Sequence, residues 1–109
     1  MTDALTAKTC VPCQGGIPPL TEDEAGAFLA QTPGWELQDG AHHLHRRFEF
    51  DDFQASLDFV NKAGAIAEEE GHHPDIEFGW GYAGITIYTH KINGLHENDF
   101  ILAAKINAI

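Results

Sequence analysis

Residues 75–90 read DIEFGWGYAGITIYTH, and this stretch decides the fold. Apolar side chains alternate with Glu or Gly along its first half: Ile76, Phe78, Trp80 and Tyr82. This period of two is typical of a half-buried β-strand whose apolar residues face one way. Gly84 permits a turn, and the β-branched residues after it predict a return strand over Ile85–His90. The stretch is therefore predicted to be an antiparallel hairpin.

A long amphipathic helix is predicted immediately before this hairpin. The pair Asp51 and Gln54 matches a capping pattern, and Gly71 is typical of the left-handed residue that ends a helix. Between them, apolar and small residues recur at helical spacing: Phe53, Leu57, Val60, Gly64 and Ala67. This helix buries one face and leads directly into the hairpin.

Two further helices are predicted, one near each end of the chain. Thr21 and Glu24 form a capping box, and the helix that they start runs to about Thr32. After a loop over residues 91–97, a last helix packs through apolar side chains: Phe100, Ala103, Ala104, Ile106 and Ile109. Residues 1–20 are interrupted by Pro and Gly and are predicted to form an irregular arm that contains a Cys-x-Pro-Cys step.

A first hairpin completes the sheet. A short strand at Trp35–Leu37 precedes the turn residues Asp39-Gly40. A second strand follows, with three apolar side chains on one face: Leu44, Phe48 and Phe50. The resulting order, α-β-β-α-β-β-α, predicts an α+β fold with a four-stranded antiparallel sheet and three helices packed on one face. Residues 21–109 are thus expected to form a single domain after the arm.

The composition argues against several classes of protein. The 109 residues include 17 Asp and Glu against 6 Lys and Arg, and the net charge of −11 argues against a surface for nucleic acid or an anionic membrane. No apolar stretch approaches the ~20 residues that span a bilayer, and no secretory signal or disulfide framework is evident. We therefore expect a cytoplasmic protein. Its seven histidines outnumber Lys and Arg together and indicate proton or metal chemistry.

Three of these histidines are predicted to meet at one end of the sheet. The segment EEEGHHP, residues 68–74, lies where the long helix ends and the third strand begins. Because the hairpin returns to this end, His90 is expected beside His72 and His73. Glu68 stands four residues before His72, where its carboxylate can accept a hydrogen bond from the imidazole if the last helical turn keeps its geometry.

Other interpretations of these residues stay open. Adjacent histidines at a helix end often contact only the terminal carbonyls, and three histidines can bind zinc, although no fourth ligand at a matching spacing is evident. Cys10 and Cys13 form half of a zinc or redox motif without the other half. His42, His43 and His45 are expected on a solvated face of a strand.

An ordered set of motifs runs along residues 10–109. They are Cys10-Val-Pro-Cys13 followed by Gly-Gly, Phe48-x-Phe50-x-Asp52-Phe53, Glu68-x-x-x-His72-His73-Pro74, Phe78-x-Trp80-x-Tyr82, Thr89-His90, and Gly94-Leu95-x-x-x-Asp99. In this combination the chain resembles the pterin-4a-carbinolamine dehydratase family in its bacterial form.

This resemblance implies an enzyme. Family members dehydrate 4a-hydroxytetrahydropterin to the quinonoid dihydropterin, which regenerates the cofactor of aromatic amino-acid hydroxylases. They act as homodimers or homotetramers, without a metal or a cofactor of their own. The family's active-site histidines fall on His72, His73 and His90, and its glutamate falls on Glu68. We expect His72 and His90 to divide the acid and base roles, and His73 to orient the pterin.

The substrate-binding side of the site and the non-enzymatic alternative complete these expectations. His73 and Asp99 are candidates for contact with the pterin, and Trp35 and Trp80 for an aromatic wall. His96 stands where the family commonly has Ser or Thr, so a slightly frayed start to the last helix is expected. The alternative hypothesis is a non-catalytic binding or assembly protein, because dehydratase-like relatives act as dimerisation partners of a transcription factor or assist Rubisco assembly.

Overall fold

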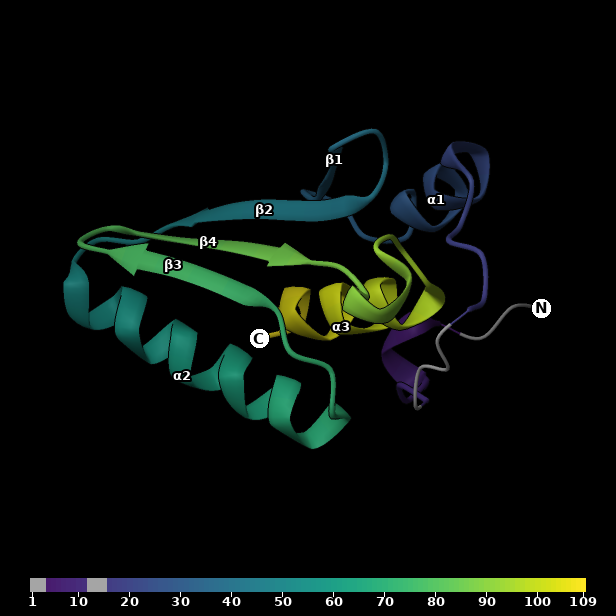
Figure 1. Ribbon diagram of the computed structural model, residues 1–109. Helices are drawn as coiled ribbons and strands as arrows, with labels where there is room; N and C mark the ends of the chain where they lie inside the picture. Colours follow the sequence, from purple (N-terminus) through teal and green to yellow (C-terminus); the bar gives the residue numbers. More distant parts are fainter. Residues whose placement is uncertain (1–3, 12–15) are drawn as a thin grey trace.

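The computed structural model describes residues 4–11 and 16–109, and its elements follow the predicted order (Figure 1). They are η1 (Leu5–Ala7), α1 (Glu22–Leu29), β1 (Glu36–Gln38), β2 (His43–Glu49), α2 (Phe53–Glu70), β3 (Asp75–Gly79), β4 (Tyr82–Ile87), η2 (His90–Ile92) and α3 (Glu97–Asn107). Both η elements are single 3-10 turns that periodicity did not predict. The predicted α+β class is confirmed.

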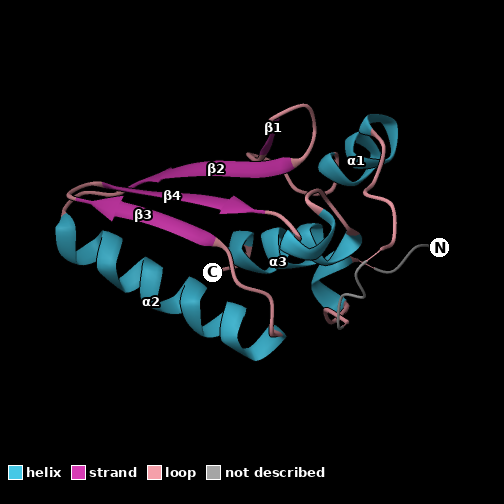
Figure 2. Cartoon of the chain, in the orientation of Figure 1, coloured by secondary structure: helices cyan, strands magenta, loops and turns pink. Residues whose placement is uncertain are grey.

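The sheet has the strand order β1-β2-β4-β3, with every neighbouring pair antiparallel. Helices α2 and α3 lie under one face of it, as Figure 2 shows. The core between these layers is formed by fully buried side chains from β2, β4 and α3: Leu44, Ile85, Ile87, Phe100, Leu102 and Ile106. Helix α1 packs against α3, where the Phe28 and Phe100 rings stack with their centroids 5.3 Å apart. Among the described residues, no helix has the length and apolarity to cross a membrane.

Helix α2 ends where it was predicted to end but begins one residue later. The predicted cap at Asp51 is wrong: Asp52 is the N-cap, and its carboxylate accepts a hydrogen bond from the Ala55 backbone N–H at 2.8 Å. Two adjacent aspartates offer the same local signal, so the pattern could not choose between them. At the other end, Gly71 adopts a left-handed φ of 65°. The His72 N–H bonds back to Ala67, which completes a Schellman motif.

The hairpin of residues 75–90 turns earlier than predicted. Its connection is Trp80-Gly81, because Gly79 pairs with Tyr82 across β3 and β4. Gly81 has a φ of 80°, a conformation that favours glycine, whereas Gly84 lies inside β4. Tyr82 therefore stands on the face opposite Ile76, not beside it as the alternation predicted. The alternation itself could not show which glycine turns the chain.

The start of α3 is capped, contrary to the expected fraying. His96 Nδ1 accepts a hydrogen bond from the Asn98 backbone N–H at 3.1 Å, and the Asp99 carboxylate accepts one from the His96 N–H at 2.8 Å. An imidazole nitrogen thus takes the part that a Ser or Thr hydroxyl takes in a capping box. The helix start is fixed, and with it the position of Asp99.

Two glycines in this fold should respond oppositely to alanine. Gly71→Ala places a Cβ at a φ of 65° and should lower the free energy of unfolding by about 1 kcal/mol. Gly26→Ala, in the exposed interior of α1 with open space around its Cβ, should raise it by about 0.5–1 kcal/mol. Urea unfolding at neutral pH measures both values. A Gly71→Ala variant as stable as the wild-type chain would contradict the assignment of Gly71 as the residue that turns the chain out of α2.

The imidazole cap of α3 can be tested in the same way. His96→Ala removes the acceptor for the Asn98 N–H and should cost about 1 kcal/mol of stability. His96→Ser restores an acceptor and should return most of that loss. If alanine and serine at this position give equal unfolding midpoints, His96 does not act as the cap.

Candidate active site

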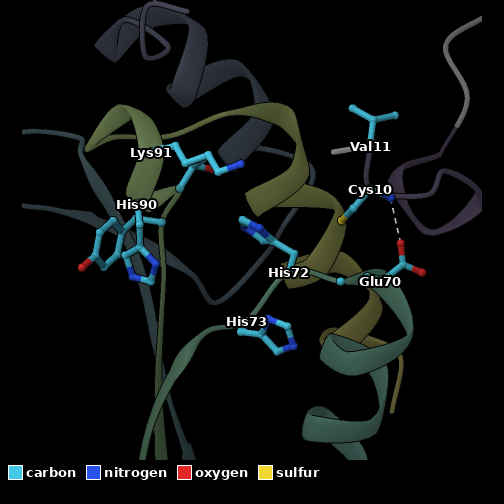
Figure 3. A pocket seen from close by; sticks show the side chains of 10 residues that line it. Cys10, Val11, Glu70, His72, His73, His90 and Lys91 are labelled. Carbon is cyan, nitrogen blue, oxygen red and sulfur yellow. Dashed lines mark hydrogen bonds between the residues drawn. The ribbon is translucent and has the colours of Figure 1, made fainter. Parts of the chain in front are cut away.

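A cavity of about 510 Å³ lies where β4 ends and β3 begins. Its walls come from the arm, the end of α2 and the segment after β4: Cys10, Val11, Glu70, Gly71, His72, His73, Tyr88, Thr89, His90 and Lys91. Figure 3 shows His72, His73 and His90 around the same opening. The hairpin and the end of α2 therefore bring together the three histidines that the sequence analysis selected.

His72 is held by a buried carboxylate. Its Nε2 lies 2.5 Å from Asp99 Oδ1, and Asp99 is fully buried while the His72 side chain is 13% exposed. Asp99 also accepts hydrogen bonds from the Thr89 hydroxyl at 2.9 Å and from the His96 N–H. Because a carboxylate accepts, the Nε2 of His72 carries the donated proton. Asp99 does not line the cavity itself, and it contacts two residues that do, His72 and Thr89.

Glu68 pairs with His73, not with His72 as its spacing suggested. The His73 Nε2 lies 3.1 Å from Glu68 Oε1, and both side chains are well exposed. The helical i,i+4 geometry fails here because Gly71 ends the helix and its left-handed conformation redirects His72. An exposed pair of this kind contributes little to stability, and it lies at the edge of the cavity, where His73 is one of the lining residues.

His90 lies on the opposite side of His72 from the arm (Figure 3). It is exposed, it begins η2, and its ring meets Tyr88 edge-on with the centroids 4.3 Å apart. Tyr88 in turn packs on His43 with a centroid distance of 4.2 Å. Tyr88 was not among the predicted site residues, although its position two residues before His90 places both on one face of an extended chain.

The arm contributes to the cavity, which the sequence analysis also missed. Cys10 and Val11 form one side of it, and Glu70 accepts a hydrogen bond from the Cys10 backbone N–H at 2.8 Å. Burial, together with the nearby Glu70 carboxylate, raises the pKa of the Cys10 thiol to about 12. The hydrogen bond from Lys105 is the main cause that lowers the pKa of Glu70. No local signal predicts these contacts, because they join residues far apart in the sequence.

The two tryptophans proposed as an aromatic wall do not line this cavity. Trp35 is buried in the core, where its Nε1–H donates to Asn107 at the far end of α3, 2.7 Å away. Trp80 is 71% exposed at the β3–β4 turn, the end of the hairpin opposite to His90. The structure thus separates both residues from the three histidines.

The remaining histidines and the arm cysteines take other places. His43 and His45 are half-buried rather than fully solvated, and His45 Nδ1 lies 3.0 Å from the Thr86 hydroxyl. His42 is exposed. Within residues 4–11 and 16–109, no three His, Cys, Asp or Glu side chains are grouped to hold a metal ion. Cys13, the second half of the Cys-x-Pro-Cys step, lies outside the described residues.

A family model and the curated relatives of this chain indicate the same family. A family model described as pterin 4 alpha carbinolamine dehydratase matches residues 18–109. A relative from Methylococcus capsulatus, provisionally named a pterin-4-alpha-carbinolamine dehydratase, is 58% identical over 106 residues, which cover 97% of this chain and 93% of the relative. A relative from Aromatoleum aromaticum with the same provisional name is 55% identical over 109 residues, covering 100% of this chain and 97% of the relative.

Solved structures show the same fold in proteins of more than one role. A protein from Brucella melitensis described as a transcriptional coactivator/pterin dehydratase matches with a TM-score of 0.77 and 36% identity, over 83% of this chain and 96% of that one. A pterin dehydratase-like protein identified as a RuBisCO assembly factor in the alpha-carboxysome matches with a TM-score of 0.60 and 30% identity, over 69% of this chain and 87% of that one. By sequence and by fold, the chain belongs to the pterin-4a-carbinolamine dehydratase family.

Proposed function

We propose that this chain catalyses the dehydration of 4a-hydroxytetrahydropterin to the quinonoid dihydropterin, and so recycles the pterin cofactor of aromatic amino-acid hydroxylases. The observation that carries this proposal is the cavity in which three imidazoles meet, two of them each paired with a carboxylate. Family membership supplies the substrate class. We also expect the homodimer or homotetramer and the cytoplasmic location that the family resemblance implies.

The reaction needs one acid and one base near neutral pH. The bond between C4a and the hydroxyl oxygen breaks, and that oxygen takes a proton and leaves as water. N5 loses its proton, and its electron pair forms the new double bond to C4a. No electron is gained or lost overall. Imidazole serves as either partner because its unperturbed pKa lies near neutrality.

We assign the base to His72. Its Nε2 proton is engaged by Asp99, which leaves Nδ1 as the ring nitrogen that can take a proton from N5. Asp99 holds the ring in that tautomer and orientation, and it stabilises the imidazolium that forms, as the carboxylate does beside a catalytic histidine in hydrolases. Asp99 is thus a positioning residue in this mechanism, not a ligand of the pterin.

We assign the acid to His90 and the orienting role to His73. His90 is exposed and faces the same opening, so the water formed by its proton transfer can leave directly to solvent. His73 is fixed by Glu68 at the edge of the cavity, where it can donate a hydrogen bond to the heteroatom edge of the pterin. Glu68 acts through His73 in this assignment.

A second candidate is a non-catalytic binding or assembly protein. The observation that favours it is the fold match to a protein identified as a RuBisCO assembly factor. The two functions predict different results in two experiments on this chain. An enzyme accelerates dehydration of the pterin on its own, whereas an assembly protein retains a protein partner in a pull-down from its host and leaves the dehydration rate unchanged.

The catalytic assignment predicts the behaviour of two histidine variants. Synthetic 4a-hydroxytetrahydropterin is followed by its ultraviolet absorbance with and without protein. We expect the wild-type chain to accelerate the loss of water, and His72→Ala and His90→Ala each to lower kcat by roughly 10²–10⁴-fold. If both variants keep full activity, the assignment of acid and base is wrong. A wild-type rate equal to the uncatalysed rate would remove the enzymatic function.

The role of Asp99 predicts a large loss without any contact to substrate. Asp99→Asn keeps the shape of the side chain but offers His72 a donor or a weaker acceptor, so that the His72 tautomer is no longer fixed. We expect kcat to fall by roughly 10²–10⁴-fold with KM changed far less. Asp58→Asn, an exposed carboxylate on α2, is the matched control and should keep wild-type rates. Rates are compared in buffer without urea, at a pH where circular dichroism shows both variants folded. An Asp99→Asn protein with wild-type activity would refute the positioning role of Asp99.

A further inference from the structure

We propose that Cys10 and Val11 of the N-terminal arm form a fixed wall of the pterin pocket, and that Asn98 and Glu70 are the positioning residues that hold this wall. The inference rests on the proposed function, because it assigns the wall to a pocket that binds a pterin. It concerns residues that neither the acid–base mechanism nor the histidine cluster uses.

Asn98 fastens the arm through two hydrogen bonds to one residue. Its Oδ1 accepts from the Val11 backbone N–H at 3.0 Å, and its Nδ2 donates to the Val11 carbonyl oxygen at 2.7 Å. A side-chain amide thus reproduces the paired bonds that a neighbouring β-strand would supply. Asn98 is 2% exposed and lies in the first turn of α3, where His96 caps its own N–H. We call these two hydrogen bonds between Asn98 and Val11 the clasp. Because Asn98 lies in a capped and buried helical turn, the α3 side of the clasp is rigid.

Glu70 fastens the same segment from the other side. Its carboxylate accepts a hydrogen bond from the Cys10 backbone N–H at 2.8 Å and pairs with Lys105 Nζ at 2.8 Å. The Glu70 side chain is only 6% exposed. A buried carboxylate left without its partners is costly, so this arrangement favours the docked arm. The last turn of α2, the arm and α3 meet at this one group.

The docked arm lies directly behind His72. Figure 3 shows Cys10 on the side of His72 away from His90, with its sulfur toward the ring and the Val11 side chain pointing outward. The Cys10 thiol donates to the Asn98 carbonyl oxygen, 3.5 Å away. Further back, Leu5 is buried in the core and Lys8 pairs with Glu97 at 2.6 Å. The arm is thus attached along residues 5–11, and residues 10 and 11 close the cavity beside the proposed base.

This arrangement predicts a specific division of effects. The hydrogen bond between His72 and Asp99 does not involve the arm, so opening the clasp should leave the chemical step nearly intact. The pterin, however, would bind only while the wall is in place, and its apparent affinity falls in proportion to the fraction of closed molecules. The wall should therefore act on KM and not on kcat.

Two full-length variants open the clasp from opposite sides. In Asn98→Asp, one carboxylate oxygen can still accept a hydrogen bond from the Val11 N–H. The other oxygen faces the Val11 carbonyl oxygen and cannot donate to it, so this bond is lost. Helix α3 itself is not weakened, because an acidic residue in the first turn of a helix is favourable. Val11→Pro removes the backbone N–H that Asn98 accepts, without a change in α3. Asn107→Ala is the matched control, because Asn107 also ties a distant segment to α3, through Trp35 and Pro33, but at the far end of the helix.

We expect KM in the dehydration assay to rise roughly fivefold to thirtyfold in both clasp variants, with kcat within about threefold of wild type. Asn107→Ala should keep KM within about twofold even where its unfolding midpoint falls as far as theirs. An unchanged KM in both clasp variants overturns the proposal. An equal rise in KM for Asn107→Ala overturns it too, because the effect would then reflect general destabilisation.

Alkylation of Cys10 reports on the clasp without any pterin. In a Cys13→Ser background under reducing conditions, iodoacetamide should modify the half-buried Cys10 slowly, and opening the clasp should raise the rate at least about tenfold. A bound dihydropterin should slow the alkylation of Cys10 further in the wild-type chain.

Faster labelling of the clasp variants with no change in KM overturns the proposal that Cys10 and Val11 form a wall of the pterin pocket. A wild-type chain that fails to accelerate dehydration overturns the proposed function and the pterin wall with it, while the labelling rates still show separately whether the clasp exists.

Discussion

The site depends on one buried carboxylate. Asp99 is inaccessible to solvent, and an ion in that position is costly unless hydrogen bonds replace the lost water. It accepts three of them, from the His72 ring, the Thr89 hydroxyl and the His96 backbone N–H. The three donors come from the segment after α2, the segment after β4 and the N-cap of α3. Satisfying this one charge therefore fixes the relative positions of three elements and places His72 at the cavity.

Helix α3 carries this arrangement because it is buried almost all round. Its apolar side chains fill the core under the sheet, while its polar residues are used at the two ends. Asn98 and Asp99 at the first turn hold the arm and His72. Asn107 at the last turn holds Trp35 and Arg46. A helix with no solvated face cannot turn about its axis without exposing apolar area, so its polar contacts stay in register.

The order of elements was predictable because the signals for it are local. The capping box of α1 and the terminal glycine of α2 act within a few residues of where they stand. The errors arose where two residues carried the same local signal. Asp51 and Asp52 are both good caps, and either Gly81 or Gly84 can turn a hairpin. Only tertiary contacts decided between them, such as the pairing of Gly79 with Tyr82.

The site was predictable in part for the same reason. The convergence of His72, His73 and His90 follows from hairpin geometry, and the structure has it. The partner of each histidine did not follow, because the left-handed Gly71 turns the chain between Glu68 and His72. The arm contacts could not be predicted, because Cys10 and Glu70 are 60 residues apart in the sequence and Val11 and Asn98 are 87 residues apart. Contacts between such distant residues produce neither a hydrophobic periodicity nor a local capping or turn pattern.

The acidic run at residues 68–70 explains how one short segment serves both sides of the cavity. Successive residues on a helix point about 100° apart, so Glu68 and Glu70 face away from each other. Glu68 stays in solvent and orients His73 at the mouth, whereas Glu70 turns inward to Lys105 and the arm. Helical geometry thus divides this acidic run into an exposed group, Glu68, and a buried group, Glu70. The end of α2 thereby places an exposed carboxylate beside His73 at the mouth of the cavity and a buried carboxylate against the arm on the other side.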